Sequence, residues 1–492
     1  MDRKDNILFQ PWNDLKKLQN RTLRHFITRE LYPFSPYYRQ LFDKHRIDPD
    51  SIKTVDGLKS IPFTSKGDFF DLSGKEPVSR HMDFLLQPDR ELIRKYLPKK
   101  KLILGLIKGK DTLKGQLENM YRPIFLTATA GTTNQPVSFL YTGYDLKNLE
   151  LYGRRIIEVF GIERDWRAVN VFPYAPHLAF WQTVFAGFAS NLFILNTGGG
   201  KTLGTDGNIR SILKVRPQFL IGVASYIYHI LNRAREQNLK LDFLKRIALG
   251  ASRVPQGFKE KISDLLTGMG ASEVKILGTY GFTESRSAWA ECPTDIDVSS
   301  GYHTYPDKEI FEVIDPDTGE VKKEGEDGEI VYSNIDARGS CVLRYRTGDM
   351  VKGGIVYSPC PYCGRTVPRI SSDIFRASNI KDISLSKIKG ALVNLGTLEY
   401  LLDGKKEIST WQIEIAKKNN DPYEVDELIL YIYPSQDLNR EDFARRLNEE
   451  IFSDADVSFN RINFVSSQEI QERLEIESSI KAKKIIDRRP EA

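Results

Sequence analysis

Thr127-Ala128-Thr129-Ala130-Gly131-Thr132-Thr133-Asn134-Gln135-Pro136 is the stretch of this 492-residue chain that says most about its fold. It follows the apolar run Ile124-Phe125-Leu126, which predicts a strand leading into a loop rich in hydroxyl groups. Backbone N–H groups and Thr hydroxyls in such a loop can surround phosphate oxygens, and Gly131 lets the backbone approach closely. The same residues are typical of an ordinary turn or helix cap, because hydroxyls bond the local backbone there. The loop by itself leaves both interpretations open.

The two common glycine-rich nucleotide motifs are missing from the sequence. Gly198-Gly199-Gly200-Lys201-Thr202 looks like the end of a Walker-type loop, but that motif requires glycine where Leu195 stands. Leu203 and Glu273 interrupt the two stretches that come closest to G-x-G-x-x-G. A nucleotide protein of either familiar glycine-loop class is therefore disfavoured.

Composition describes a soluble globular protein with enough apolar residues for a large core. Hydrophobic residues make up 40% and charged residues 28% of the chain, and a net charge of +5 does not indicate a nucleic-acid partner. The first residues lack the apolar core of a signal peptide, and no apolar run reaches the roughly 18 residues that span a bilayer. Four cysteines argue against a disulfide scaffold. We expect a cytoplasmic protein without a transmembrane segment, and a homodimer is left open.

The pattern of the chain changes along its length. Residues 1–75 are expected to be helical and aromatic-rich. Residues 90–114 carry nine Lys or Arg against two acids, around the apolar residues 102–107. This segment predicts either a solvated helix pair or a basic flap that meets a phosphorylated ligand or an anionic membrane. The flap would allow peripheral membrane contact.

Between residues 125 and 350, short β-rich apolar runs alternate with amphipathic helical stretches. This alternation favours an α/β fold with layers around parallel strands. Residues 309–357 instead show antiparallel strands with tight turns, and residues after 372 have their own strands and helices. We expect a large N-terminal α/β domain, residues 1–372, with a β-rich subdomain at about 309–372. A small α+β domain, residues 373–492, follows it.

Four further segments bear on the opening loop. Residues 278–284 end in Tyr280, Gly281, Thr283 and Glu284, where an aromatic ring can stack on a base and a carboxylate can hold Mg²⁺. Asp349 follows a glycine turn and can accept both hydroxyls of a ribose. Gly250, Ala251 and Ser252 form a loop after a buried strand, and residues 480–490 are rich in lysine and arginine. Each segment alone is also typical of a turn or a helix cap.

Taken in this order, the motifs resemble the adenylate-forming (acyl-AMP) ligase superfamily, and within it the phenylacetate–coenzyme A ligase family. The resemblance runs from about residue 36 to residue 489. It implies the adenylate-forming ligase fold, with a small C-terminal domain that is mobile. It also implies a two-step reaction, in which a carboxylic acid and ATP give acyl-AMP and pyrophosphate, and the thiol of coenzyme A then displaces AMP.

The resemblance also implies site residues. Thr127, Thr129, Gly131, Thr132 and Thr133 would close over the ATP phosphates. Gly250, Ala251 and Ser252 would flank the adenine, Tyr280 would stack against it, and Asp349 would hold the ribose. Gly281 and Arg376 in the hinge would also bind the nucleotide. The catalytic residues would be Thr283 at the α-phosphate, Glu284 on Mg²⁺, and Lys481, which reaches the carboxylate and α-phosphate from the small domain. Lys483 and Lys484 are alternatives to Lys481.

Three positions depart from the family pattern. Asn134-Gln135-Pro136 replaces the usual Gly-x-Pro, and Ala130 replaces a serine. Ile480 stands where a glycine normally precedes the lysine, and the hinge at residues 375–382 is longer than usual. These departures bear on rate and on the second half-reaction.

Cys360-Pro361-Tyr362-Cys363-Gly364 is a pair of thiols at zinc-knuckle spacing, followed by a glycine turn. Tetrahedral zinc needs two further ligands, and Cys292 and His303 can supply them. The resemblance implies such a structural Cys₃His site in some family members. The alternative is a set of reduced, partly buried thiols with a surface histidine, and Cys341 is expected to lie in the core.

Residues 172–181 follow a predicted buried strand and are unusually aromatic. The resemblance implies that this region lines the acyl pocket, with Tyr174, His177 and Phe180, and that Ser225 and Tyr226 complete its wall. An aromatic lining suits an aryl or other hydrophobic acid, although plain core packing gives the same pattern. Two alternatives to a coenzyme A ligase stay open: an adenylating enzyme with another acceptor, and a catalytically silent nucleotide-binding member.

Overall fold

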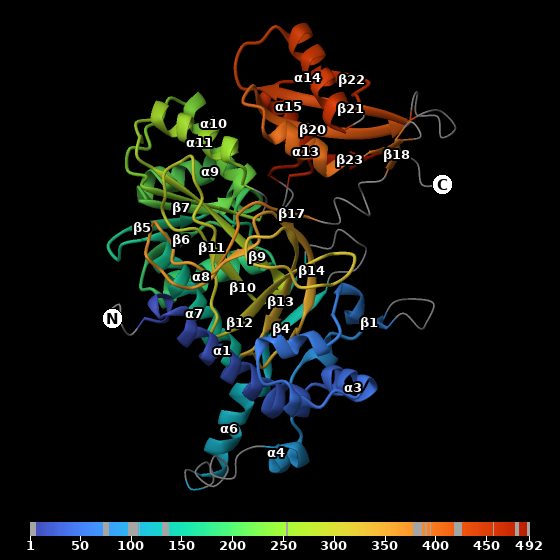
Figure 1. Ribbon diagram of the computed structural model, residues 1–492. Helices are drawn as coiled ribbons and strands as arrows, with labels where there is room; N and C mark the ends of the chain where they lie inside the picture. The colour runs from blue at the N-terminus through green and yellow to red at the C-terminus, as the bar shows by residue number, and fades with distance from the viewer. Residues whose placement is uncertain are drawn as a thin grey trace.

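The computed structural model describes residues 6–71, 78–96, 107, 109–129, 137–251, 254–376, 386–388, 391–393, 395–417, 426–455, 457–477 and 482–489. These residues form two lobes with separate hydrophobic cores (Figure 1). The N-terminal lobe is large and mixed α/β. The C-terminal lobe, drawn in orange and red at the top of Figure 1, is small. The α/β fold class is confirmed, while the boundary at residue 372 stays a prediction.

Helices dominate the start of the chain, as its sequence predicts. The first are α1 (Trp12–Phe26) and α3 (Pro36–His45). Ser35 starts α3 because its side chain accepts a hydrogen bond from Tyr38 N and Pro36 occupies the first helical position. The basic segment includes α4 (Arg90–Tyr96) and leads to α6 (Lys110–Tyr121), both at the lower end of Figure 1. Residues 97–106 and 108 lie outside the described residues, so the basic flap stays a prediction.

A nine-stranded sheet forms the centre of the large lobe. Five strands are parallel, in the spatial order β6 (Phe193–Asn196), β5 (Arg167–Asn170), β7 (Phe219–Val223), β8 (Arg246–Gly250) and β9 (Lys275–Phe282). The sheet continues antiparallel through β10 (Ser287–Ala290), β11 (Tyr302–His303), β16 (Arg369–Ile370) and β15 (Ile355–Val356). Every residue of β7 is buried, because helices cover the parallel part of the sheet. These helices are α7 (Gly143–Phe160), α8 (Leu178–Ala189), α9 (Gly200–Val215), α10 (Ala224–Glu236) and α11 (Gln256–Gly268).

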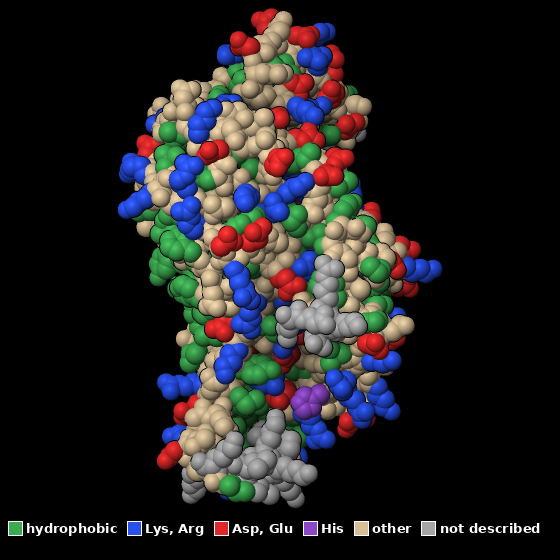
Figure 2. All heavy atoms as spheres, turned by 90° about the vertical axis from the view of Figure 1, so that its left-hand side faces the viewer, with side chains coloured by type: hydrophobic (Ala, Val, Ile, Leu, Met, Phe, Trp, Pro, Cys, Tyr) green, Lys and Arg blue, Asp and Glu red, His purple; other side chains and the backbone are tan. Residues whose placement is uncertain are grey.

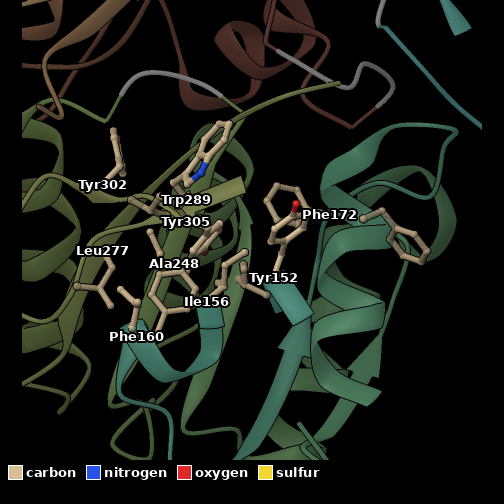
Figure 3. Close-up of a cluster of buried hydrophobic side chains, with 14 of the residues drawn as sticks. Tyr152, Ile156, Phe160, Phe172, Ala248, Leu277, Trp289, Tyr302 and Tyr305 are labelled. Atoms are coloured by element: carbon tan, nitrogen blue, oxygen red, sulfur yellow. The ribbon is translucent and has the colours of Figure 1, made fainter. Parts of the chain in front are cut away.

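Helix α7 anchors the core of the large lobe. Its side chains Tyr152, Ile156 and Phe160 face apolar side chains from the sheet (Figure 3). Tyr152 stacks on Tyr305 with ring centroids 5.4 Å apart. Thr142 and Asp145 form a capping box at the start of the helix, so these two residues define its first turn directly after strand β4 (Ser138–Thr142).

The β-rich region is split between two sheets. A four-stranded antiparallel sheet contains β12 (Glu309–Ile314), β13 (Gly328–Asn334), β14 (Tyr345–Val351) and β17 (Ile374–Arg376). Strands β15 and β16 join the nine-stranded sheet instead, because β16 pairs with β11. The expectation of one subdomain over residues 309–372 is therefore corrected: part of that range belongs to the central sheet, and β17 extends past it. A separate hairpin pairs β3 (Pro123–Ala128) with β4 (Ser138–Thr142).

The C-terminal lobe is a four-stranded sheet with helices on it. Its order is β22 (Arg461–Phe464), β21 (Asp426–Pro434), β20 (Ile408–Lys417) and β23 (Ile485–Asp487). Helices α13 (Leu395–Asp403), α14 (Arg440–Ala455) and α15 (Ser467–Leu474) complete it, and β18 (Ser386–Ile388) with β19 (Ala391–Val393) forms a hairpin. Within the described residues, no helix combines the length and apolar character that crossing a membrane requires.

Candidate active site

The parallel strands bring four of the predicted segments to one edge of the central sheet. Residues 172–181 follow β5, Ser225 and Tyr226 follow β7, Gly250 ends β8, and Tyr280 lies near the end of β9. Carboxyl ends of parallel strands meet at the same edge, which is where open α/β sheets bind ligands. Gly250 lies close to its neighbours, since a Cβ there would be 2.4 Å from Thr279 Oγ1 and 3.2 Å from Phe172 Cζ. The next residue, Ala251, adopts a left-handed φ of 63°, and Ser252 lies outside the described residues.

Strands β3 and β4 hold the base of the Thr-rich loop. Thr127 is buried, and its hydroxyl lies 3.1 Å from Tyr141 Oη. Thr129 Oγ1 accepts a hydrogen bond from Val137 N at 2.9 Å. Both hydroxyls therefore have partners in the protein and fix the hairpin. Gly131, Thr132 and Thr133 fall outside the described residues, so their contact with phosphate stays a prediction.

The same hairpin contacts the aromatic segment that follows β5. Ala128 N donates to Pro176 O at 2.7 Å, and His177 Nδ1 lies 3.0 Å from Ala128 O. The predicted phosphate loop and the predicted acid pocket thus share a boundary. His177 acts at this boundary as a link between two backbone segments.

Strand β14 connects to the end of β9 through two hydrogen bonds. Tyr280 Oη donates to Asp349 Oδ2 at 2.8 Å, and Tyr345 Oη donates to Glu284 Oε1 at 2.9 Å. Tyr345 and Asp349 are four residues apart on β14, so they lie on the same face of the strand. Thr283 and Glu284 lie in a short 3₁₀ turn directly after β9. The residues predicted for adenine, ribose and magnesium are therefore neighbours.

Strand pairing fixes the positions of two other residues that are predicted to bind the nucleotide. Gly281 pairs with Ala288 on β10, and a Cβ there would lie 3.0 Å from the Ala288 Cβ. Arg376 on β17 pairs with Asp349 on β14. The backbone of Arg376 thus lies beside the residue predicted to hold the ribose, while its side chain is outside the described atoms.

A buried ion pair supports the turn that carries Glu284. Arg286 has a left-handed φ of 56°, and its guanidinium lies 2.9 Å from the carboxylate of Asp145 at the start of α7. Burial tends to raise the pKa of Asp145, but the charge of Arg286 and hydrogen bonds from the backbone of Thr142 and Arg338 hold that pKa below its usual value. The pair ties the turn to the core of the large lobe.

The aromatic segment forms a cluster at the sheet edge. Tyr174 is 66% exposed and packs edge-on against Phe180 and Trp181, with ring centroids 5.3 Å and 6.0 Å away. Phe180 is buried, and Tyr226 is held by a 3.0 Å hydrogen bond from Asn208. Tyr174 therefore presents a ring to solvent above a packed aromatic base.

The triple glycine of the sequence belongs to this cluster. A Cβ at Gly198 would lie 3.3 Å from the Cβ of Tyr174, and one at Gly200 would lie 2.9 Å from the ring of Tyr226. Gly198 and Gly199 both adopt a φ of +77°. The stretch does not match a Walker-type loop, and its sequence alone suggested no other role. Its three consecutive glycines after a strand were the signal for a close approach between the backbone and the aromatic side chains.

Cys292, His303, Cys360 and Cys363 converge on one point, as predicted. Their ligand atoms all lie within 4.8 Å of one another. Cys292 Sγ is 3.8 Å from Cys360 Sγ, and Cys363 Sγ is 3.3 Å from His303 Nε2. The second ring nitrogen, His303 Nδ1, lies 3.3 Å from Ala290 O, which leaves Nε2 for a ligand. Three thiols and one imidazole at this spacing are the donor set of structural zinc.

Cys341 lies apart from this cluster in the core. Burial raises the pKa of its thiol to about 12. It therefore stays protonated at neutral pH and packs as a small apolar residue.

The lysines before β23 have different surroundings. Lys483 Nζ lies 2.7 Å from Glu475, and Lys484 Nζ lies 2.6 Å from Asp403, over the ring of Trp411. Both cations are therefore neutralised within the C-terminal lobe. Lys481 lies outside the described residues.

Similar proteins share the whole architecture. A solved structure of 2-hydroxyisobutyryl-CoA ligase in the postadenylation state, in complex with 2-HIB-AMP, superposes with a TM-score of 0.71 at 18% identity, covering 98% of this chain and 91% of that one. This chain has the fold of the adenylate-forming ligases. The fold therefore agrees with the resemblance that the motifs predict.

Curated relatives cover nearly the same length. The phenylacetate-coenzyme A ligase of Thermus thermophilus is 25% identical over 451 residues, which are 90% of this chain and 86% of that protein. The phenylacetate-coenzyme A ligase of Aromatoleum evansii is 24% identical over 502 residues, covering 97% and 95%. No family model matches the chain.

Proposed function

We propose that this chain is an AMP-forming acid–coenzyme A ligase. A carboxylic acid and ATP would give acyl-AMP and pyrophosphate, and coenzyme A would then take the acyl group and release AMP. The observation that carries the proposal is the pair of hydrogen bonds from β14 to β9, Tyr280–Asp349 and Tyr345–Glu284, at the ligand edge of the parallel sheet. The names of the similar ligases support the same reaction.

The roles in adenylation follow from the positions of the residues. Tyr280 would stack on the adenine beside Gly250 and Ala251, and Asp349 would accept hydrogen bonds from the ribose. Thr283 would contact the α-phosphate, and Glu284 would hold Mg²⁺. When bound, Mg²⁺ supplies positive charge that offsets the phosphate oxygens.

The acid must approach a phosphate of like charge. A carboxylate oxygen attacks the α-phosphorus and pyrophosphate leaves, so cations and N–H donors are needed where charge develops. We assign the mobile cation to Lys481, as the resemblance implies. Lys483 and Lys484 are ion-paired within the C-terminal lobe. The thiolate of coenzyme A then attacks the acyl carbon, and AMP leaves.

The acid would be aryl or otherwise hydrophobic. The exposed ring of Tyr174, packed on Phe180 and Trp181, offers an apolar surface beside the phosphate loop. Coenzyme A as acceptor is tested by measuring AMP release from acid and ATP with and without coenzyme A. We expect strong stimulation by coenzyme A. Exchange of pyrophosphate without such stimulation would instead indicate a different thiol or cofactor as acceptor.

We propose that the cysteine and histidine cluster holds one structural zinc ion. With four protein ligands the site would be closed, so zinc would link β10 and β11 to the loop before β16 without taking part in catalysis. Metal analysis after gentle purification should give about one zinc per chain, and Cys360→Ser should lose it. Cys341→Ser is the matched control and should keep it. Less than one zinc per two chains in the unmodified protein would contradict the site.

A further inference from the structure

The two lobes are joined by a small set of polar contacts from helices α9, α10 and α11. Tyr228 Oη on α10 lies 2.6 Å from Ser409 Oγ on β20, and both residues are buried. Lys261 Nζ on α11 donates to the backbone carbonyl of Ile408. One turn of α11 thus holds the beginning of the longest strand in the C-terminal lobe.

A second contact holds the chain just before the predicted catalytic lysine. Thr205 on α9 donates to the carboxylate of Glu477, and His229 Nε2 lies 3.0 Å from Thr205 Oγ1. Burial lowers the pKa of His229, so its ring is neutral near pH 7 and serves as a hydrogen-bond donor to Thr205. Glu477 precedes Lys481 by four residues.

The lining of a cavity at this joint shows which residues of the C-terminal lobe face the large lobe. The cavity is small, about 60 Å³, and is lined by residues of both lobes, including Ser225, His229 and Ala482. Ser225 lies two residues after β7, at the edge of the sheet that carries the candidate site. Ala482 is the residue next to Lys481 in the sequence. The observed orientation thus brings the segment beside Lys481 to the strand ends.

The contacts between the two lobes can be broken at little cost in free energy. Each lobe has its own hydrophobic core, and among the described residues Ile476 of the C-terminal lobe packs against the core of the large lobe, so little apolar contact is broken when the lobes part. On the face drawn in Figure 2, the C-terminal lobe sits directly on the body of the molecule. The outer contact, Lys406 to Glu260 at 2.9 Å, has side chains 78% and 32% exposed and contributes little.

We propose that Tyr228, Lys261 and Thr205 are positioning residues that latch the C-terminal lobe in the orientation used for adenylation. The inference rests on the proposed function. These residues would favour acyl-AMP formation by holding Glu477 and Ala482, the described residues on either side of Lys481, against the large lobe, and the latch would be released before transfer to coenzyme A. The contacts act on the orientation of the lobe and touch neither nucleotide nor acid.

The test separates the two half-reactions in a double variant, Tyr228→Phe with Lys261→Met. We expect acid-dependent pyrophosphate exchange to fall about tenfold, since one buried and one partly buried hydrogen bond that favour one orientation are lost. Thioester formation from supplied acyl-AMP and coenzyme A should stay within about twofold of the unmodified rate, because that step does not use the latch. Lys240→Met, an exposed lysine after α10, is the matched control and should change neither rate.

Small-angle X-ray scattering of the same proteins gives a readout that does not depend on activity. The double variant should have a larger radius of gyration than the unmodified protein and the control. Equal loss of both half-reactions, or unchanged exchange with unchanged scattering, would overturn the latch. If the unmodified protein exchanges pyrophosphate with no acid, the proposed function fails, while the scattering comparison still decides whether the contacts hold the lobe.

Discussion

Tyr345 shows how one side chain can fix the position of a residue that is predicted to bind magnesium. Its hydroxyl donates to Glu284, while Asp349 on the same face of β14 accepts from Tyr280. The sequence motif names Glu284 and Asp349 but gives Tyr345 no role, although the i, i+4 spacing along an alternating strand was visible. Whether two strands meet at that face depends on sheet pairing, which residue types alone do not determine.

Removing the hydroxyl of Tyr345 tests whether its hydrogen bond positions Glu284. Tyr345→Phe should lower pyrophosphate exchange about three- to tenfold and raise the Mg²⁺ concentration needed for half-maximal rate, because Glu284 loses a fixing hydrogen bond. Tyr32→Phe is a matched control, since Tyr32 Oη also donates to a carboxylate, Asp43, at 2.9 Å. Equal effects of both substitutions, or no change in the Mg²⁺ requirement, would rule out the positioning role.

Glu309 is a buried acid whose protonation affects stability. Burial raises its pKa to about 8 from an ordinary 4.5, although hydrogen bonds from Tyr305 N and Trp289 Nε1 act in the opposite direction. Between these two pH values the folded state holds a proton that the unfolded chain releases. Stability should therefore decrease as pH rises from about 4.5 to 8, by up to about 1.4 kcal/mol per pH unit from this group.

Glu309→Gln should remove the part of the pH dependence of stability that comes from this carboxyl group. The measurement is the free energy of unfolding in denaturant at pH 5.5 and pH 7.5, for the unmodified protein, Glu309→Gln and the exposed control Glu118→Gln. The Glu309→Gln variant should show a flatter decrease with pH, and the control should leave the decrease unchanged. The same slope in all three proteins would show that Glu309 does not carry the proton.

At the level of elements, the hydrophobic pattern predicts where the strands lie in the sequence better than it predicts which strands pair. The sequences of β5, β7, β8 and β9 are short continuous apolar runs, which predict buried parallel strands. The amphipathic spacing between these runs predicts the helices that connect them. The sequence does not show that β6 lies outside β5, or that β15 and β16 join the central sheet. Strand order depends on long-range packing, and very short strands such as β11 carry no periodicity.

The loop between β6 and α9 offers a test of the acid pocket. Gly200→Ala would place a Cβ 2.9 Å from the Tyr226 ring, so the ring must shift. We expect the KM for the acid to change about tenfold while the KM for ATP stays constant. Gly115→Ala on α6 is a matched control, because no atom would lie within 4 Å of its Cβ. An altered KM for ATP, or no change for the acid, would place Tyr226 outside the pocket.

For the whole molecule, the sequence predicts two lobes and their order along the chain. It also predicts the four members of the cysteine and histidine cluster, and their ligand atoms do converge. It does not predict the joint between the lobes, since Tyr228, Lys261 and Thr205 belong to no motif and meet the C-terminal lobe only in the folded structure. These contacts between the lobes therefore arise only in the folded chain.

The central claim is that this molecule joins an acid to AMP. The most direct measurement is acid-dependent exchange of labelled pyrophosphate into ATP, with a panel of aryl and aliphatic acids. We predict exchange with a hydrophobic or aryl acid, a loss of about a hundredfold in Lys481→Ala, and near-normal exchange in the matched control Lys483→Ala. Tight nucleotide binding with no exchange for any acid would contradict the claim and leave a silent nucleotide-binding protein.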